Sequence, residues 1–206
     1  MKIEVKISKK PIKYRVAMNI LEKRIKSVIE NKKPELLWIL EHDSIYTGGT
    51  SYKDSEILDK SIKVIKTNRG GKITWHGPGQ IICYFVIDLN KRKKDVKKFI
   101  TTIENTIIKT LNFYNVQSFN DPKNIGIWVK KKNYTQKVGA IGLRLKKWIA
   151  YHGFSINVYN KIDNYKKIVP CGISNMGVTS LYLYKEQNYK NIKKKIIKNF
   201  IDNLKF

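Results

Sequence analysis

Residues 81–89 constrain the fold more than any other stretch, because they form a continuous apolar run, Ile-Ile-Cys-Tyr-Phe-Val-Ile-Asp-Leu. A run of this length and composition is typical of a strand buried on both faces of a sheet. Directly before it, residues 69–80 hold four of the twelve glycines, together with Arg69 and His76. Since glycine lets the backbone approach a ligand closely, we expect part of a binding site beside a buried strand.

The chain is expected to form one domain, residues 1–206, of α/β or α+β architecture. Its 206 residues and 42% hydrophobic content are sufficient for a substantial core. Single helices follow the first and middle strands, and later strands follow one another directly. This order favours a mixed sheet with flanking helices over a regular doubly wound fold.

Individual elements follow from the periodicity of apolar residues. Apolar stripes predict helices within residues 14–28, 96–111 and 192–204. Strands are predicted within residues 1–7, 35–41, 62–66, 81–89, 125–129, 139–145 and 148–158. The last three should form a meander whose polar hairpin tip is residues 130–136. A loop is expected at residues 46–50 and a turn at 168–172.

Basic side chains strongly outnumber acidic ones, with 42 Lys and Arg against 16 Asp and Glu and a net charge of +26. Such a surface attracts polyanions, and an acidic protein, a nucleic acid or an anionic membrane would each satisfy it. Lys, Ile and Asn also recur throughout the chain, as AT-biased codon usage would produce. Charge alone therefore does not select a partner.

The chain is predicted to be a soluble cytoplasmic protein, or an organellar one after removal of a transit peptide. Its two cysteines, Cys83 and Cys171, show no disulfide framework, which favours a reducing compartment. The first residues lack the apolar core of a signal peptide, and no apolar run approaches the roughly 20 residues of a membrane span. We therefore expect no membrane partner.

Motifs for nucleotide loops and metal sites are not matched. Residues 70–73 lack the hydroxyl residue and the glycine spacing of a phosphate-binding loop, and residues 77–79 lack the third glycine of a dinucleotide loop. The spacing of a common zinc site is absent among the candidate ligands His42, His76, His152, Cys83 and Cys171. We therefore expect no metal.

The two cysteines lie in different settings. Cys83 lies within the apolar run and is expected to be a core residue. Cys171 stands between a proline and a glycine, in a turn that would suit a nucleophile or an incidental surface thiol. A catalytic thiol needs a basic or cationic neighbour, because the pKa of a free cysteine is about 8.5. The candidates are Lys137, His76 and His152.

Four ordered blocks resemble one known family. Residues 69–80 (RGGKITWHGPGQ), 137–144 (KVGAIGLR), 151–158 (YHGFSINV) and 170–172 (PCG) are similar to the signature blocks of the octanoyltransferases of lipoate biosynthesis. Upstream, Glu41-His42 and Thr47-x-Gly49 also look like that family. The blocks follow the family's order over most of the chain, which is far more specific than one glycine motif.

The resemblance implies a domain like that of the biotin and lipoate protein ligases, with a larger mixed sheet, a smaller sheet and flanking helices. It implies transfer of an octanoyl group from octanoyl-acyl carrier protein to a lysine of lipoyl domains, without a cofactor or a nucleic-acid partner. The acceptors would belong to 2-oxoacid dehydrogenase complexes or be the glycine cleavage H protein. By motif position, Cys171 corresponds to the acyl-accepting cysteine and Lys137 to the lysine that lowers its pKa and handles protons.

The family's substrate-contacting segments fall on three stretches of this chain. By position they are Arg69, Gly70, Gly71, Lys72, Ile73, Thr74, Trp75, His76, Ala140, Ile141, Gly142, Gly153, Phe154 and Ser155. An acyl slot is expected to be lined by Ile73, Trp75, Ile141 and Phe154. Backbone N–H groups that could approach the thioester oxygen as it becomes an oxyanion belong to Gly70, Gly71, Gly77 and Gly142.

Three other interpretations stay open at this point. An ATP-dependent lipoate or biotin ligase would share the fold and use a lysine in a similar strand, but it would need no cysteine. A cysteine-dependent amidotransferase would move octanoyl or lipoyl groups between proteins. A nucleic-acid-binding protein would explain the charge and leave the ordered blocks unexplained.

Overall fold

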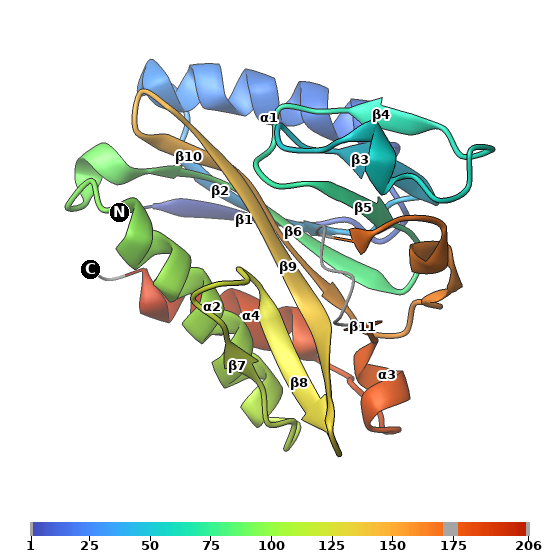
Figure 1. Ribbon diagram of the computed structural model, residues 1–206. Helices are drawn as coiled ribbons and strands as arrows, with labels where there is room; N and C mark the ends of the chain where they lie inside the picture. Colours follow the sequence, from blue (N-terminus) through green and yellow to red (C-terminus); the bar gives the residue numbers. More distant parts are fainter. Residues whose placement is uncertain (1, 171–176, 205–206) are drawn as a thin grey trace.

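The computed structural model describes residues 2–170 and 177–204, so that Cys171 lies outside the described residues. Over these two ranges, an eight-stranded and a three-stranded sheet are flanked by helices (Figure 1). The larger sheet has the order β1 (Ile3–Ile7), β2 (Glu35–Leu40), β6 (Gln80–Asp88), β10 (Ile149–Asn157), β9 (Tyr134–Lys146), β8 (Ile127–Lys131) and β7 (Phe119–Asn120), and β11 (Gly177–Val178) pairs with β9. The smaller sheet has the order β4 (Val64–Lys66), β3 (Ile45–Gly48) and β5 (Ile73–His76).

Both parallel and antiparallel pairs occur, as the predicted mixed sheet requires. The strand β1 runs parallel to β2, and β6 runs antiparallel to both β2 and β10. The predicted meander is confirmed, since β8, β9 and β10 pair antiparallel in chain order. The fold class predicted from the sequence is therefore confirmed.

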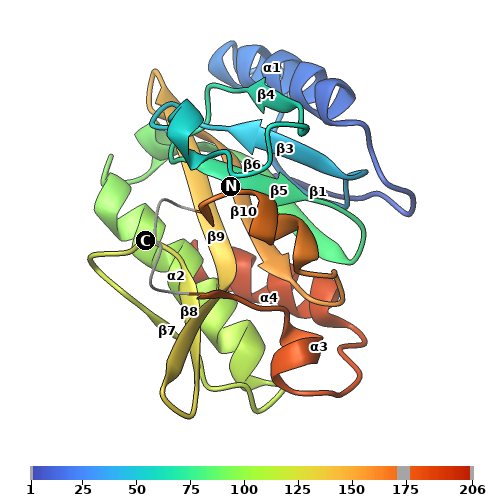
Figure 2. The ribbon, with the colours of Figure 1, turned by 45° about the vertical axis from the view of Figure 1, so that its right-hand side comes forward.

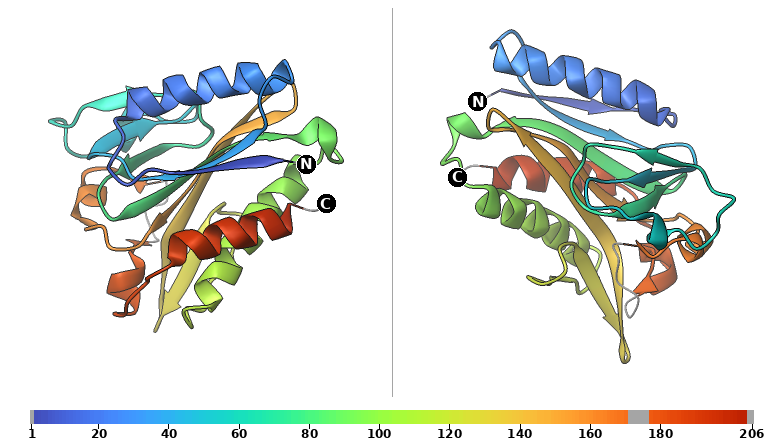
Figure 3. Two further views of the ribbon diagram at one scale, coloured as in Figure 1. Left: turned by 180° about the vertical axis from the view of Figure 1, so that it is seen from behind. Right: turned by 45° about the horizontal axis from the view of Figure 1, so that its top comes forward.

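Helices cover both faces of the larger sheet. The helix α1 (Tyr14–Ile29) packs on one face through Ala17, Leu21 and Ile25, because these apolar residues recur at helical spacing. The helices α2 (Val96–Asn112) and α4 (Ile192–Asn203) pack on the opposite face, as the two views of Figure 3 show. The smaller sheet lies on the same side as α1 (Figure 2). A short helix, α3 (Leu181–Tyr184), precedes α4.

The strand β6 is the centre of the core, and all nine of its residues are buried. On the side of α2 and α4, the ring of Phe85 lies 5.2 Å from that of Phe99 and 5.8 Å from that of Phe200, measured between centroids. Cys83 has no exposed surface, and burial raises the pKa of its thiol far above the ordinary range. The predictions of a doubly covered strand at residues 81–89 and of a core cysteine are confirmed.

One local prediction is wrong, and another is confirmed with narrower bounds. Residues 46–50 were expected to be a loop, yet β3 occupies most of them, because Tyr46 and Thr47 are buried between two neighbouring strands. Residues 130–136 were expected to be a polar hairpin tip. The hairpin is confirmed, but its tip is only residues 132–133, because β8 runs to Lys131 and β9 begins at Tyr134. Polar residues are tolerated there because this end of the hairpin is exposed on both faces.

Candidate active site

A cavity of about 490 Å³ lies where the smaller sheet meets β9 and β10 of the larger sheet. One wall comes from residues 69–74 and His76, and the other comes from residues 140–143 and 152–155. The lining is completed by Tyr14 of α1, Ser51, Ile82 and Tyr84 of β6, Ile100 of α2, the loop of residues 123–125 and Lys137 of β9. The cavity therefore joins segments that lie between residues 14 and 155 of the sequence.

The predicted binding residues meet at this cavity, with one exception. Its lining includes every predicted residue of the three stretches except Trp75. Successive side chains of a strand point to opposite faces, and Trp75 points away from its neighbours Thr74 and His76. Its indole Nε1 donates to Ser44 Oγ at 2.9 Å, and its ring packs edge-on against Tyr165. The expectation that Trp75 lines the cavity is therefore wrong.

Arg69, in the segment between β4 and β5, is hydrogen-bonded to β3 at the cavity wall. Its Nη2 donates to the carbonyl oxygen of Thr47 at 2.7 Å and to Thr47 Oγ1 at 3.0 Å. Gly49 is needed beside it, because a Cβ at that position would lie 2.2 Å from the carbonyl oxygen of Gly71. Gly71 itself has a φ of +86°, in the left-handed region that favours glycine. These contacts shape the wall that the glycine-rich stretch predicted.

The histidines of the cavity are held neutral. Burial lowers the pKa of His76 to about 3. The nearby His42 and Arg69 also oppose protonation, and a hydrogen bond to Gln80 favours it. Burial, together with Arg69 and Arg144, lowers the pKa of His152 to about 4. Both rings are therefore uncharged at neutral pH. They can exchange hydrogen bonds with a ligand, but they supply no positive charge that would stabilise a thiolate.

Lys137 is a buried cation at the border of the cavity. It lies within β9, is only 6% exposed, and its Nζ donates to the carbonyl oxygen of Ile125 at 3.1 Å. The same Nζ lies 4.6 Å from the centroid of the Trp128 ring. Lys137 also lines a small recess beyond the cavity, which it shares with Thr74, Ser155, Asn157, Tyr165, Pro170 and Val178.

The described residues on both sides of 171–176 contact the strand of Lys137 or its recess. Pro170 lines the recess, and Val178 of β11 is in register with Lys137. The backbone N–H of Thr179 donates to the carbonyl oxygen of Lys137 at 2.9 Å. Cys171 itself lies outside the described residues, so its proximity to Lys137 stays a prediction.

Comparison with known proteins adds evidence that is independent of this geometry. The model of the lipoyl protein ligase A/B catalytic domain matches residues 13–201. The chain belongs to this family. It is 44% identical over 183 residues to the octanoyltransferase of Parvibaculum lavamentivorans, covering 86% of this chain and 81% of that protein. It is 38% identical over 203 residues to the octanoyltransferase of Anaplasma phagocytophilum, covering 97% and 98%.

A solved structure supports the fold of this lipoyl ligase A/B family member. The crystal structure of a lipoate-protein ligase A bound with ATP is similar with a TM-score of 0.78, covering 99% of this chain and 86% of that one. The two sequences are 15% identical, so the likeness concerns the fold. The curated relatives, which are named octanoyltransferases, make this family member an enzyme of the acyltransferase class.

A hydrogen-bond network that sequence reasoning missed includes Asn157 and Tyr165, which line the recess of this acyltransferase. The side-chain Nε2 of Gln80 donates to Asn157 Oδ1 at 2.8 Å and to the hydroxyl of Tyr165 at 2.9 Å. Asn157 in turn donates to the carbonyl oxygen of Thr179 at 3.0 Å. Gln80 and Asn157 belong to the blocks that resemble the family, and this membership could have indicated their role. Nothing in the sequence pattern pointed to Tyr165.

The expected oxyanion donors fit the acyltransferase site only in part. The backbone N–H of Gly70 already donates to the carbonyl oxygen of Leu143 at 3.2 Å. Gly77 does not line the cavity, whereas Gly71 and Gly142 do. Gly71 and Gly142 are therefore the expected donors that lie at the cavity, and the role of all four glycines toward a thioester oxygen stays a prediction.

Among residues 2–170 and 177–204, no group of three or more His, Cys, Asp or Glu side chains is placed to hold a metal ion. None of the helices in the same part of the chain is long and apolar enough to cross a membrane.

Proposed function

We propose that this chain, acting as one catalytic domain, transfers an octanoyl group from octanoyl-acyl carrier protein to a lysine of lipoyl domains, through a thioester on Cys171. The observation that carries the proposal is the buried Lys137 ammonium, at the border of a cavity whose lining brings together the three recognised binding segments. The relatives from Parvibaculum and Anaplasma are named octanoyltransferases, which supports octanoyl as the acyl group. The acceptors would be lipoyl domains of 2-oxoacid dehydrogenase complexes or the glycine cleavage H protein.

The first half of the reaction is an exchange of thioesters. The Cys171 thiolate attacks the carbonyl carbon of the donor thioester, and the thiolate of the carrier leaves. The Lys137 ammonium favours the Cys171 thiolate before the attack and then gives a proton to the leaving thiolate. Because one thioester replaces another, the octanoyl group stays activated.

The second half forms the amide. The ε-amine of the acceptor lysine attacks the Cys171 thioester, and the Cys171 thiolate leaves. The neutral amine of Lys137 takes the proton that the attacking nitrogen loses, which restores the ammonium and thiolate pair. The histidines at the cavity need not act as bases in this sequence.

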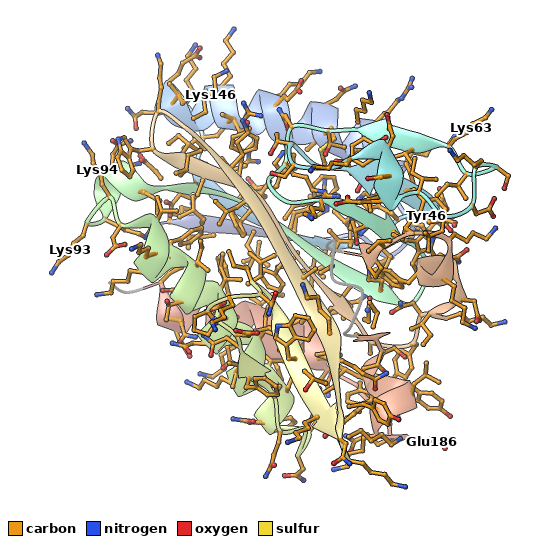
Figure 4. The ribbon with its side chains drawn as sticks, viewed as in Figure 1. Tyr46, Lys63, Lys93, Lys94, Lys146 and Glu186 are labelled. Carbon is orange, nitrogen blue, oxygen red and sulfur yellow. The ribbon has the colours of Figure 1, made fainter. Side chains whose placement is uncertain are left out.

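The cavity and the surface charge suit these substrates. Ile73, Ile141 and Phe154 present apolar side chains in the cavity lining, as an acyl chain requires. Lysine side chains extend outward around the molecule, among them Lys93, Lys94 and Lys146 (Figure 4). A basic surface steers acidic carrier and lipoyl domains toward the protein, and the net charge of +26 provides it.

Intact-protein mass spectrometry tests the proposal. Incubation with octanoyl-acyl carrier protein without ATP should add the mass of one octanoyl group to the wild-type protein. The Cys171→Ala variant should show no added mass, whereas Cys83→Ala, which changes a buried thiol outside the cavity, should still be labelled. Labelling of Cys83, or an absolute requirement for ATP, would contradict the mechanism.

A further inference from the structure

The segment of residues 124–128 encloses the end of the Lys137 side chain. The carbonyl oxygen of Ile125 accepts a hydrogen bond from Lys137 Nζ, and the face of Trp128 lies 4.6 Å from the same nitrogen. The indole is itself fixed, because its Nε1 donates to the carbonyl oxygen of Asn124 at 2.9 Å. Trp128 is 1% exposed and is absent from the cavity lining, so it contacts the site through Lys137 and through Asn124, which lines the cavity.

Gly126 provides the space that Lys137 occupies. Its φ is +140°, a conformation that residues with a side chain rarely adopt. A Cβ at this position would lie 2.8 Å from the carbonyl oxygen of Gly139, 3.0 Å from Lys137 Cε and 3.3 Å from Lys137 Nζ. A glycine here therefore lets the lysine side chain lie against the backbone of residues 125–126.

The two contacts of the ammonium stabilise its charge without cancelling it. An aromatic face attracts a cation through its quadrupole, and a carbonyl oxygen attracts it through its dipole. Both groups are electrically neutral. The ion pairs found among residues 2–170 and 177–204 do not include Lys137. The net positive charge therefore stays available to a group that approaches from the cavity.

We propose that Trp128, together with Gly126, is a positioning residue: it holds Lys137 Nζ against its ring, at the border between the cavity and the recess. The consequence for octanoyl transfer rests on the function proposed above, whereas the effect on Lys137 does not. If Trp128 were only a core residue, its replacement would change stability and leave the protonation of Lys137 unaltered.

Chemical labelling of the Lys137 amine tests the effect on Lys137 directly. Full-length wild-type, Trp128→Phe and Trp128→Met proteins are treated with acetic anhydride over a range of pH, and modification of Lys137 is measured by peptide mass spectrometry. Trp128→Met should shift the midpoint of the pH profile to lower pH by about 0.5–1.5 units, because the π face is lost. Trp128→Phe keeps a π face and should shift it less. Easier access alone would raise the rate by one factor at every pH.

Trp148 provides a matched control. Its ring also lies near a lysine, 5.9 Å from Lys94 Nζ, but it is 40% exposed and does not belong to the cavity lining. Trp148→Met should leave the Lys137 profile unchanged. A folded Trp128→Met protein whose profile matches the wild type would overturn the proposal. If Trp128→Met does not fold, NMR of the wild-type protein decides: ring-current shifts move the Lys137 Hε protons upfield if the proposal holds, and ordinary shifts overturn it.

Octanoyl transfer by the same variants separates this proposal from the proposed function. Acylation by Trp128→Met at neutral pH should be slower by about tenfold, because Lys137 Nζ is no longer held in place, and Trp128→Phe should recover most of the loss. A shifted Lys137 profile with unchanged acylation would support the positioning of Lys137 and contradict its catalytic role. An unshifted profile overturns the positioning whatever the acylation rate.

Discussion

Two buried cations of this protein are held in opposite ways. Arg92, which follows β6, forms a two-pronged pair with Glu35 at the start of β2, with Nη2 and Oε2 3.0 Å apart and both side chains 2% exposed. Lys137 in β9 is held by a carbonyl oxygen and an aromatic face. The guanidinium is neutralised within the fold, whereas the ammonium keeps its net charge.

The difference shows that the charge of Arg92 serves the stability of the fold, whereas the charge of Lys137 can act on a bound group. Removing one partner of a buried ion pair leaves the other charge uncompensated, so the pair is sensitive to mutation. Removing a cation that is held by neutral groups leaves no unpaired charge behind and so lowers the free energy of unfolding less. Such a cation can also stabilise a negative charge on a bound substrate or a neighbouring group. Stability and activity should therefore respond in opposite ways at the two positions.

The largest effect is expected on the activity of Lys137→Met. Loss of the ammonium and of its proton transfer should slow octanoylation by about 10²–10⁴-fold. The free energy of unfolding should change by no more than about 1 kcal/mol, because the apolar chain fills the same space without a buried charge. Octanoyl-transfer rates and urea unfolding of the same preparation measure both quantities. A large loss of stability with activity retained would reverse the comparison.

The converse effect is expected for Glu35→Gln. The variant leaves the Arg92 guanidinium buried without its carboxylate, which should lower the free energy of unfolding by about 3–5 kcal/mol. The acylation rate of the folded fraction should stay near that of the wild type, because neither side chain lines the cavity. Urea unfolding and single-turnover acylation provide the two measurements. An unchanged unfolding midpoint would show that the pair is not the structural charge described here.

A smaller effect is expected for His152→Asn, which tests a buried base held neutral. The folded-state pKa of His152 is about 4 against an ordinary value of 6.5, so below pH 6.5 the unfolded chain binds this proton more readily than the folded one. Its contribution to stability is complete above about pH 6.5 and falls as the pH decreases toward 4, by about 2–3 kcal/mol.

Asparagine is a suitable replacement at position 152 because it does not titrate and tolerates the left-handed φ of +71° found there. The loss of unfolding free energy between pH 6.5 and 4 should therefore be smaller in the variant. Urea titrations at both pH values measure it, and His76 should retain its own acid dependence in both proteins. Equal losses in the two proteins would count against a neutral His152.

Much of the fold could be predicted because buried elements have apolar residues at regular spacing in the sequence. The helices around Leu21 and Ile103 and the buried strand around Phe85 were found because their apolar residues recur with the period of the element or run without interruption. The loop expected near Gly48 was wrong, because glycines serve turns and closely packed strands equally well and spacing does not separate the two.

The parts of the cavity that are formed by consecutive residues could be predicted from the sequence. The parts that depend on how separate elements pack against one another could not. The glycine-rich stretch indicated one wall, but the side of β5 on which Trp75 lies depends on the strand's register in the smaller sheet. Tyr14 reaches the same cavity from α1, where its spacing indicates only a core residue. The contact between Trp128 and Lys137 joins β8 to β9. It depends on a register shift between Ile127 and Trp128, which no sequence pattern predicts.

The strand order of the larger sheet also determines how this molecule can open. The strand β10 lies between β6 and β9, although it is the last of the three in the sequence, and its residues Phe154 and Ser155 line the cavity. Its partners in β6 are Cys83 and Ile82, which belong to the buried core. The backbone amides of Phe154 and Ser155 should therefore exchange with solvent only when the larger sheet unfolds, so this wall of the cavity stays rigid.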